Sequence, residues 1–187
     1  NRLCVPLPVY VIADQLGVPR SELASLKKWS DASTSRLGRL ANEEQQVQNA
    51  KDIVEFQHYF ADLIDRMRDH PEDNIISDLA NNTIDEGRLL TKPEALGMIQ
   101  QILVAGNETS TNAIAGGVVL LIENPEEQSK LRANLDLIPT AVEEILRLET
   151  PTSGMWRRAT QDTEIDGVAI PEGSFLMVRF AAGNRDE

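Results

Sequence analysis

The chain has 187 residues, of which 41% are hydrophobic and 26% are charged, and both values are ordinary for a globular protein. Its formal net charge of −12 argues against nucleic-acid binding and against docking on anionic membranes, because both need a basic face. A single cysteine, Cys4, leaves no intramolecular disulfide and suits a reducing compartment such as the cytoplasm.

The first part of the chain predicts a series of helices separated by proline and glycine. We expect a short helix over residues 8–16 and the start of another at Ser21. A long helix follows over residues 42–69, where apolar residues recur as a broken stripe. A short helix over residues 74–81 and a polar loop over residues 81–91 lead to the next long element.

Residues that commonly bind metals are sparse in this chain. The two histidines, His58 and His70, are twelve positions apart, whereas a zinc site needs more ligands at closer spacing. We therefore expect both histidines at the surface or at a helix end. Cys4 is predicted to be a small core residue. No metal ligand is assigned within this chain.

The longest predicted helix starts at Thr91, which can cap it, and stops before Pro125. Its roughly 32 residues far exceed the ~11–12 of an average helix. Apolar side chains surround it almost completely, which predicts a buried central strut. It is not expected to span a membrane, because polar residues interrupt it within the length a bilayer requires. These residues are Gln100, Gln101, Asn107 and Glu108.

The middle of this helix contains residues that are unfavourable in a buried helix. Gly106 weakens the helix, Glu108 adds a carboxylate, and the hydroxyl of Thr109 can bond to a carbonyl one turn back. Small residues also share one face at helical spacing, namely Gly106, Ser110, Ala113 and Gly117. That face predicts either close packing by another helix or a large planar ligand beside an acid–alcohol pair. Local violations of folding logic often mark functional sites.

Beyond the strut, a short helix over residues 125–134 and a further helix over residues 140–149 are expected. Glu144 and Arg147 can meet on the surface of the second, although such pairs are common and uninformative alone. The periodicity then changes to β: a hairpin over residues 164–170 turns at Asp-Gly, and a hydrophobic strand covers residues 174–180. The fold class is therefore mainly α with a small β-hairpin region.

Several motifs resemble those of the cytochromes P-450, the haem-thiolate monooxygenases. The hexapeptide AGNETS at residues 105–110 is similar to the signature of their long I helix. Glu144 and Arg147 resemble their K-helix motif, in which both residues are buried and share a network with a downstream arginine. The run over residues 157–173 resembles the segment that follows the K helix in bacterial members. Residues 182–186 match the family's Ala-Asn-Arg-Asp phrase loosely, with Gly183 where alanine is usual.

The resemblance covers essentially the whole chain and implies part of a cytochrome P-450 fold. It predicts one partial domain over residues 1–187. A helical part over 1–149 would contain the I helix at 92–124 and the K helix at 139–149, and a β-rich part would cover 150–187. The segment before Asn1, which is not a methionine, and the later loop with the axial cysteine are expected to lie outside this chain. Residues 8–19 resemble the phrase that stands just before the family's F helix, which roofs the substrate pocket. Cys4 precedes that phrase and has no axial-ligand loop around it, so it is not that ligand.

The implied activity is insertion of one oxygen atom from O2 into a hydrophobic small molecule. The implied cofactor is haem b, and electrons would come from NAD(P)H through a ferredoxin and ferredoxin reductase or a similar donor. Thr109 would position a water chain beside dioxygen, and Glu108 would supply protons from solvent. Haem contacts are predicted at Ala105, Gly106 and Thr109. The Arg157 guanidinium would bind a haem propionate, because its planar fork suits a carboxylate.

Substrate contacts are predicted from the F-helix region and from the loop that leads into Arg157. The pocket candidates are Ile102, Ala105, Met155 and Trp156. A second interpretation is a haemless helical binding module or an inactive fragment of the same fold. The joint presence of Thr109, Glu144, Arg147 and Arg157 favours the monooxygenase, because a binding module has no use for that set.

Overall fold

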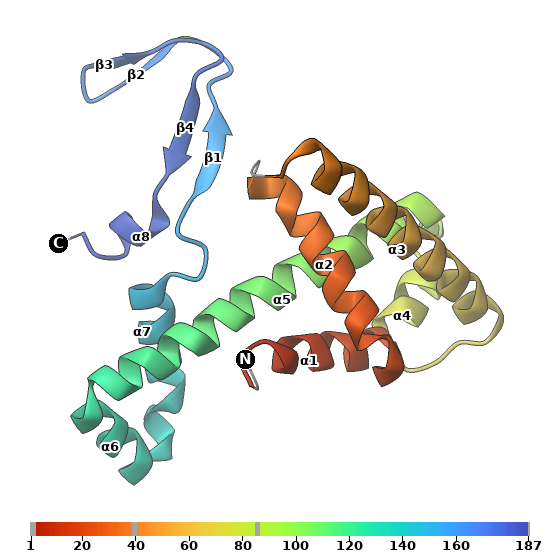
Figure 1. Cartoon of the computed structure of the whole chain (residues 1–187), viewed down its shortest axis with the longest axis horizontal. Coiled ribbons are helices and arrows are strands. Elements are labelled where there is room, and N and C mark those ends of the chain that lie inside the picture. The colour runs from red at the N-terminus through yellow and green to blue at the C-terminus, as the bar shows by residue number, and fades with distance from the viewer. Residues whose placement is uncertain (1–2, 39–40, 85–86, 187) are drawn as a thin grey trace. The chain divides into compact units, whose positions relative to one another are not determined.

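A computed structural model describes residues 3–38, 41–84 and 87–186 of the chain, without the side chains of residues 36–38. In these ranges the protein is mainly helical with two small antiparallel strand pairs, which confirms the predicted fold class (Figure 1). The chain divides into two compact units, Asn1–Thr111 and Asn112–Glu187, and the division falls within one long helix. The single partial domain expected from the sequence stays a prediction.

The first unit consists of helices in the predicted order, although their ends differ slightly. α1 begins two residues earlier than expected because Pro6, with its fixed φ angle, suits a first helical turn. A short 3-10 turn precedes α2, and the break after α1 is formed by Gly17 at a φ of 68°. The elements are α1 (Pro6–Leu16), η1 (Arg20–Glu22), α2 (Leu23–Gly38), α3 (Glu43–Asp69), α4 (Ile75–Asn81) and the first part of α5 (Lys92–Glu123).

Asparagine side chains define where α3 and α4 start. The Asn42 side chain accepts a hydrogen bond from the Gln45 backbone N–H at 2.9 Å, and Gln45 Oε1 accepts one from the Asn42 N–H at 3.1 Å. This reciprocal pair satisfies two amides that a helix start would otherwise leave unpaired. Asn74 caps α4 in the same way by accepting from the Ser77 N–H at 2.9 Å. The two helix starts predicted at these asparagines are therefore their caps.

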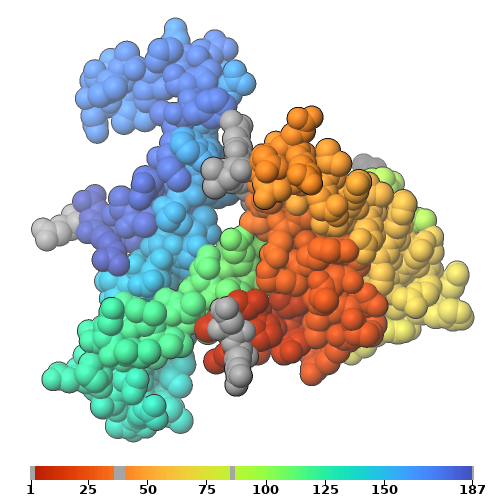
Figure 2. Space-filling view, in the orientation of Figure 1, coloured from red at the N-terminus to blue at the C-terminus, as the bar shows by residue number. Residues whose placement is uncertain are grey.

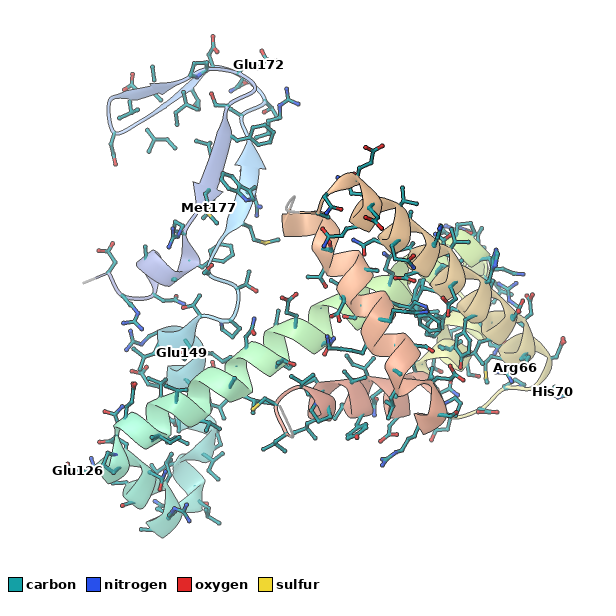
Figure 3. The ribbon with its side chains drawn as sticks, in the orientation of Figure 1. Arg66, His70, Glu126, Glu149, Glu172 and Met177 are labelled. Carbon is teal, nitrogen blue, oxygen red and sulfur yellow. The ribbon has the colours of Figure 1, made fainter. Side chains whose placement is uncertain are left out.

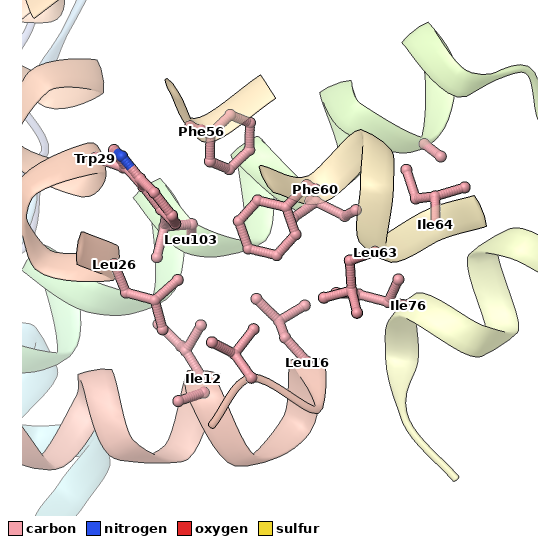
Figure 4. Packing of buried hydrophobic residues seen from close by; sticks show 14 of the residues in the cluster. Ile12, Leu16, Leu26, Trp29, Phe56, Phe60, Leu63, Ile64, Ile76 and Leu103 are labelled. Carbon is pink, nitrogen blue, oxygen red and sulfur yellow. The ribbon is translucent and has the colours of Figure 1, made fainter. Parts of the chain in front are cut away.

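An aromatic cluster between α2 and α3 forms the centre of the first unit's core (Figure 4). The Trp29 ring meets Phe56 and Phe60 edge-on, with ring centroids 6.0 and 5.9 Å apart. In the space-filling view the orange surfaces of α2 and of the first part of α3 lie against each other (Figure 2). α5 contributes its fully buried stripe to the same core, namely Ala95, Ile99 and Leu103.

The exposed histidines and Cys4 lie away from that core. His58 is exposed on α3, and His70 is exposed at the C-terminal cap of α3 (Figure 3), which confirms the surface and helix-end positions. Cys4 is only half-buried, in the turn before α1, so the expectation of a core cysteine was wrong. The buried side of α1 begins later, at Pro8, once the helix turns towards the core.

The second unit contains the end of α5, further helices and two strand pairs. β1 pairs antiparallel with β4, and β2 pairs with β3 in the predicted hairpin. Asp166 and Gly167 form its turn at positive φ angles of 50° and 79°, as the Asp-Gly signal predicts. The expected strand over residues 174–180 is shorter, because Phe180 already starts a helix. The elements are α6 (Pro125–Ala133), η3 (Leu135–Leu137), α7 (Ile138–Glu149), β1 (Met155–Arg158), β2 (Thr163–Ile165), β3 (Val168–Ile170), β4 (Phe175–Val178) and α8 (Phe180–Gly183).

Replacing Glu94 with glutamine is expected to destabilise the protein at neutral pH but not at pH 2. Hydrogen bonds from Arg88 and from Thr91 lower the pKa of Glu94 from 4.5 to about 2. A carboxylate with a depressed folded-state pKa stabilises the fold above its unfolded pKa, and this contribution is lost as pH falls from 4.5 towards about 2.

Thermal denaturation across this pH range provides the measurement. The melting temperature of Glu94→Gln should lie below that of the native protein near pH 6, and the two curves should converge as pH falls. A constant difference down to pH 2 would show that the Glu94 carboxylate does not titrate between these values.

Candidate active site

The segment predicted to carry the chemistry lies on α5, where its neighbours differ sharply in exposure. Ala105 and Glu108 are exposed, Thr109 is half-buried, and Asn107 is buried. The Thr109 hydroxyl donates a hydrogen bond to the Ala105 carbonyl oxygen one turn earlier. This is the local bond expected from the sequence, and α5 remains helical through it. Within the described ranges, Glu108 forms no ion pair.

Two glycines on the small-residue face of α5 lie close to side chains of other helices. A Cβ at Gly106 would lie 3.1 Å from Ile12 Cδ1 on α1, and one at Gly117 would lie 3.0 Å from Ile145 Cγ2 on α7. Each glycine therefore allows close approach of a helix within its own unit. The helix-packing alternative is supported at these two positions, and the haem contact expected at Gly106 stays a prediction. The neighbouring side of α5, which carries Ala105 and Thr109, is the more open one.

Asn107 is a polar residue at a core position, and the sequence analysis gave it no role. Its exposed fraction is 3%, and its amide Nδ2 donates a hydrogen bond to Ser30 Oγ on α2 at 3.0 Å. Its Oδ1 has no hydrogen-bond partner among the described residues. An unsatisfied buried acceptor of this kind typically costs about 1–3 kcal/mol. The signal in the sequence that could have indicated this role is an asparagine between Gly106 and Glu108 in an otherwise apolar helix.

Glu144 and Arg147 form the predicted pair on α7, with two hydrogen bonds of 2.7 and 2.6 Å between guanidinium and carboxylate. The hydrogen bond from Arg147 lowers the pKa of the Glu144 carboxyl group. Arg147 Nη1 also donates to the Asn184 carbonyl oxygen at 2.7 Å. Arg185 Nη2 donates to the Leu148 carbonyl oxygen at 2.7 Å. The end of α7 is thus tied to the segment after α8.

The burial expected for this pair is not found. The side chains of Arg147 and Glu144 are 45% and 53% exposed, because no described residue covers this side of α7. Arg185, which follows α8, bonds to a backbone carbonyl of the helix. The predicted contact between Glu144 and Arg147 is present, and the network with a downstream arginine stays a prediction.

Arg157 and Arg158 end strand β1 in different environments. Arg157 Nη1 donates to the carbonyl oxygen of the preceding residue, Trp156, and no carboxylate pairs with Arg157 in the described part of the chain. The Arg158 guanidinium lies over the Phe175 ring, 5.9 Å from its centroid.

Gly154, just before β1, allows the chain to lie close to the end of β4, since a Cβ at Gly154 would lie 2.5 Å from the Val178 carbonyl oxygen.

The predicted site residues fall into two groups, one in each unit. Ile102, Ala105, Gly106, Glu108 and Thr109 share α5 in the first unit. The second unit holds Met155, Trp156 and Arg157 on β1, where all three side chains are exposed. The structure brings members together within each group. That both groups form one site stays a prediction.

These residues fit a haem at two points. The open side of α5 offers Ala105 and the Thr109 hydroxyl, and β1 offers the Arg157 guanidinium without an acidic partner, which suits a propionate. Gly106 is half-buried beside Ile12, and its contact with haem stays a prediction. No three His, Cys, Asp or Glu residues come together as a metal site in the described ranges.

Comparison with known proteins gives a consistent answer. The family description Cytochrome P-450 matches residues 23–187. The chain is 36% identical over 184 residues to the cytochrome P-450 monooxygenase PikC of Streptomyces venezuelae, covering 98% of this chain and 42% of that protein. It is 37% identical over 185 residues to the putative cytochrome P-450 YjiB of Bacillus subtilis (strain 168), covering 97% and 46%. The ligand-free structure of cytochrome P-450 TbtJ1 matches with a TM-score of 0.90 and 34% identity, over 98% of this chain and 48% of that one.

The chain therefore belongs to the cytochrome P-450 family, which confirms the resemblance carried by residues 105–110 and by Glu144 and Arg147. It spans less than half the length of these three proteins. Among the described residues, no helix combines the length and the apolar character that crossing a membrane requires.

Proposed function

We propose that this chain is the central part of a haem-dependent monooxygenase that inserts one oxygen atom from O2 into a hydrophobic small molecule. The observation that carries the proposal is the acid–alcohol pair Glu108–Thr109 on the open side of a long helix. Haem b is the proposed cofactor. Electrons are supplied from NAD(P)H through a ferredoxin and its reductase or a similar donor.

When bound, a haem with a thiolate ligand supplies the activation of dioxygen. Ala105 and Thr109 would contact the haem, and Arg157 would hold a propionate. The Thr109 hydroxyl hydrogen already donates to Ala105, so the Thr109 oxygen is left as an acceptor that orients a water molecule. Glu108, being exposed, exchanges its proton with bulk water and passes it into that water chain. This route would supply the protons that the reaction with O2 requires.

The proposed substrate is bulky and apolar. Ile102 and Ala105 on α5, with Met155 and Trp156 on β1, supply the contacts, and the last two are 47% and 59% exposed in this chain. Two relatives support this class of substrate by name, a vitamin D(3) 25-hydroxylase of Pseudonocardia autotrophica and a steroid C26-monooxygenase of Mycolicibacterium smegmatis. A further matching structure holds an acyl carrier protein ligated with hexadec-9Z-enoic acid.

An absorption spectrum of the full-length protein that carries this chain, reduced and exposed to carbon monoxide, tests the proposal. A thiolate-type Soret band is expected. A haem spectrum without that band would overturn the haem-thiolate assignment. A protein purified without haem, and unable to bind added haemin, would instead support the helical binding module.

Replacing Arg157 with alanine is expected to weaken haem retention by roughly tenfold, because a charge-assisted bond to a propionate is lost. Haem transfer to apomyoglobin measures the rate of loss. Arg158→Ala is the matched control on the same strand, because Arg158 already stacks on Phe175. Faster haem loss from Arg158→Ala than from Arg157→Ala would reverse the assignment of the two arginines.

A further inference from the structure

Two hydrogen bonds of the same kind connect α2 and α5. In each, an amide side chain on α5 donates to a serine hydroxyl on α2: Gln100 Nε2 to Ser33 Oγ at 3.2 Å, and Asn107 Nδ2 to Ser30 Oγ at 3.0 Å. The first lies two turns before the Glu108–Thr109 pair, and the second lies directly beside it. The two helices are therefore linked both near the proposed chemistry and away from it.

The link at Asn107 lies in a turn of α5 whose residues weaken the helix. Gly106 lowers helix propensity, and the Thr109 hydroxyl competes for the Ala105 carbonyl oxygen. In the same turn, Ile12 fits against Gly106 and Ser30 binds Asn107, so α1 and α2 hold adjacent positions of the helix. A helix held at residues 106 and 107 cannot rotate freely about its axis. This fixes the directions in which residues 108 and 109 point.

Packing alone does not account for an asparagine at this position. Leucine has a similarly branched side chain, is a better helix former, and leaves no polar atom of its own unpaired, whereas the Oδ1 atom of Asn107 has no partner among the described residues. A locally unfavourable residue next to a reactive segment is the pattern expected where function and stability compete.

We propose that Asn107 is a positioning residue, which holds Glu108 and Thr109 in their productive orientation by binding Ser30 on α2. Neither Asn107 nor Ser30 touches the reacting atoms in this scheme. The inference rests on the proposed function, because it assigns Asn107 to the proton route of that reaction. Its physical basis, a buried bond that restrains residues 105–110, does not depend on haem.

The test compares Asn107→Leu, Ser30→Ala and the matched control Ser33→Ala in the full-length protein. Hydrogen–deuterium exchange of peptides covering residues 105–113 reports the restraint without any turnover. Asn107→Leu and Ser30→Ala should each raise exchange there by about three- to tenfold, the effect of one lost hydrogen bond, and Ser33→Ala should leave it unchanged.

The second readout is the amount of product formed per NAD(P)H consumed. This ratio should fall by a similar factor in Asn107→Leu and Ser30→Ala, with KM unchanged, while the melting temperature of Asn107→Leu stays at or above the native value. Equal behaviour of Ser30→Ala and Ser33→Ala in both readouts would overturn the proposal. So would faster exchange with an unchanged ratio. Absence of a thiolate-type haem spectrum would overturn the proposed function instead. The exchange data would still show whether the Asn107–Ser30 bond restrains residues 105–113.

Discussion

Replacing Thr109 with alanine is expected to lower the product formed per NAD(P)H consumed by about tenfold or more, with hydrogen peroxide released in its place. Positioned proton transfer typically contributes 10²- to 10⁴-fold, and the variant removes the hydroxyl that orients the water while leaving Glu108 intact. NAD(P)H consumption should continue, because electron delivery does not use this hydroxyl. Parallel assays of NAD(P)H, product and peroxide in the full-length protein give the measurement.

Stability cannot produce this result, which makes the prediction specific. The Thr109 hydroxyl bonds to the Ala105 carbonyl oxygen within the helix, a bond that loosens helices, and alanine is the best helix former. Thr109→Ala should therefore melt at or above the native temperature. Thr109→Ser, which keeps the hydroxyl, is the control. It should retain most of the product formed per NAD(P)H consumed. Full product yield in Thr109→Ala would remove Thr109 from the proton route.

The helix boundaries were predictable because local chemistry determines them. Asn42 and Asn74 bond to amides three residues later, so cap and helix start lie within one turn of sequence. The Asp166–Gly167 turn is equally local, because a two-residue hairpin needs positive φ angles at those positions. In each case the interacting groups are neighbours in the chain, and the residue type alone indicates the geometry.

The faces of α5 were not predictable in the same way. Small residues allow close approach of a helix or of a ligand, and only the position of Ile12 shows which of the two Gly106 serves. The bond between Asn107 and Ser30 joins residues 77 positions apart, so no local pattern indicates it. The sequence indicated the hexapeptide at residues 105–110 by its resemblance to a family, and the structure shows which residues of α1 and α2 contact it.

Replacing Phe60 with alanine is expected to reduce the free energy of unfolding by about 3–5 kcal/mol, the usual cost of removing a buried aromatic ring. Phe60 is fully buried, and its ring centroid lies 4.8 Å from that of Phe56, 5.1 Å from that of Tyr59 and 5.9 Å from that of Trp29. Urea denaturation of the full-length protein measures the loss. Val54→Ala is the matched control on α3, because Val54 is 47% exposed, and it should change stability by less than about 0.5 kcal/mol.

This variant also separates stability from positioning. Phe60 contacts Trp29 on α2, which precedes Ser30, but neither Ser30 nor Asn107 is changed in this variant, so we expect the hydrogen bond between them to remain. At temperatures where Phe60→Ala is folded, its product per NAD(P)H should therefore match the native ratio, although it is far less stable than Asn107→Leu. If Phe60→Ala lost the same fraction of product as Ser30→Ala, loosening of α2 in general would explain both, and the bond to Asn107 would have no separate role. A loss in Ser30→Ala alone would assign the effect to that single hydrogen bond.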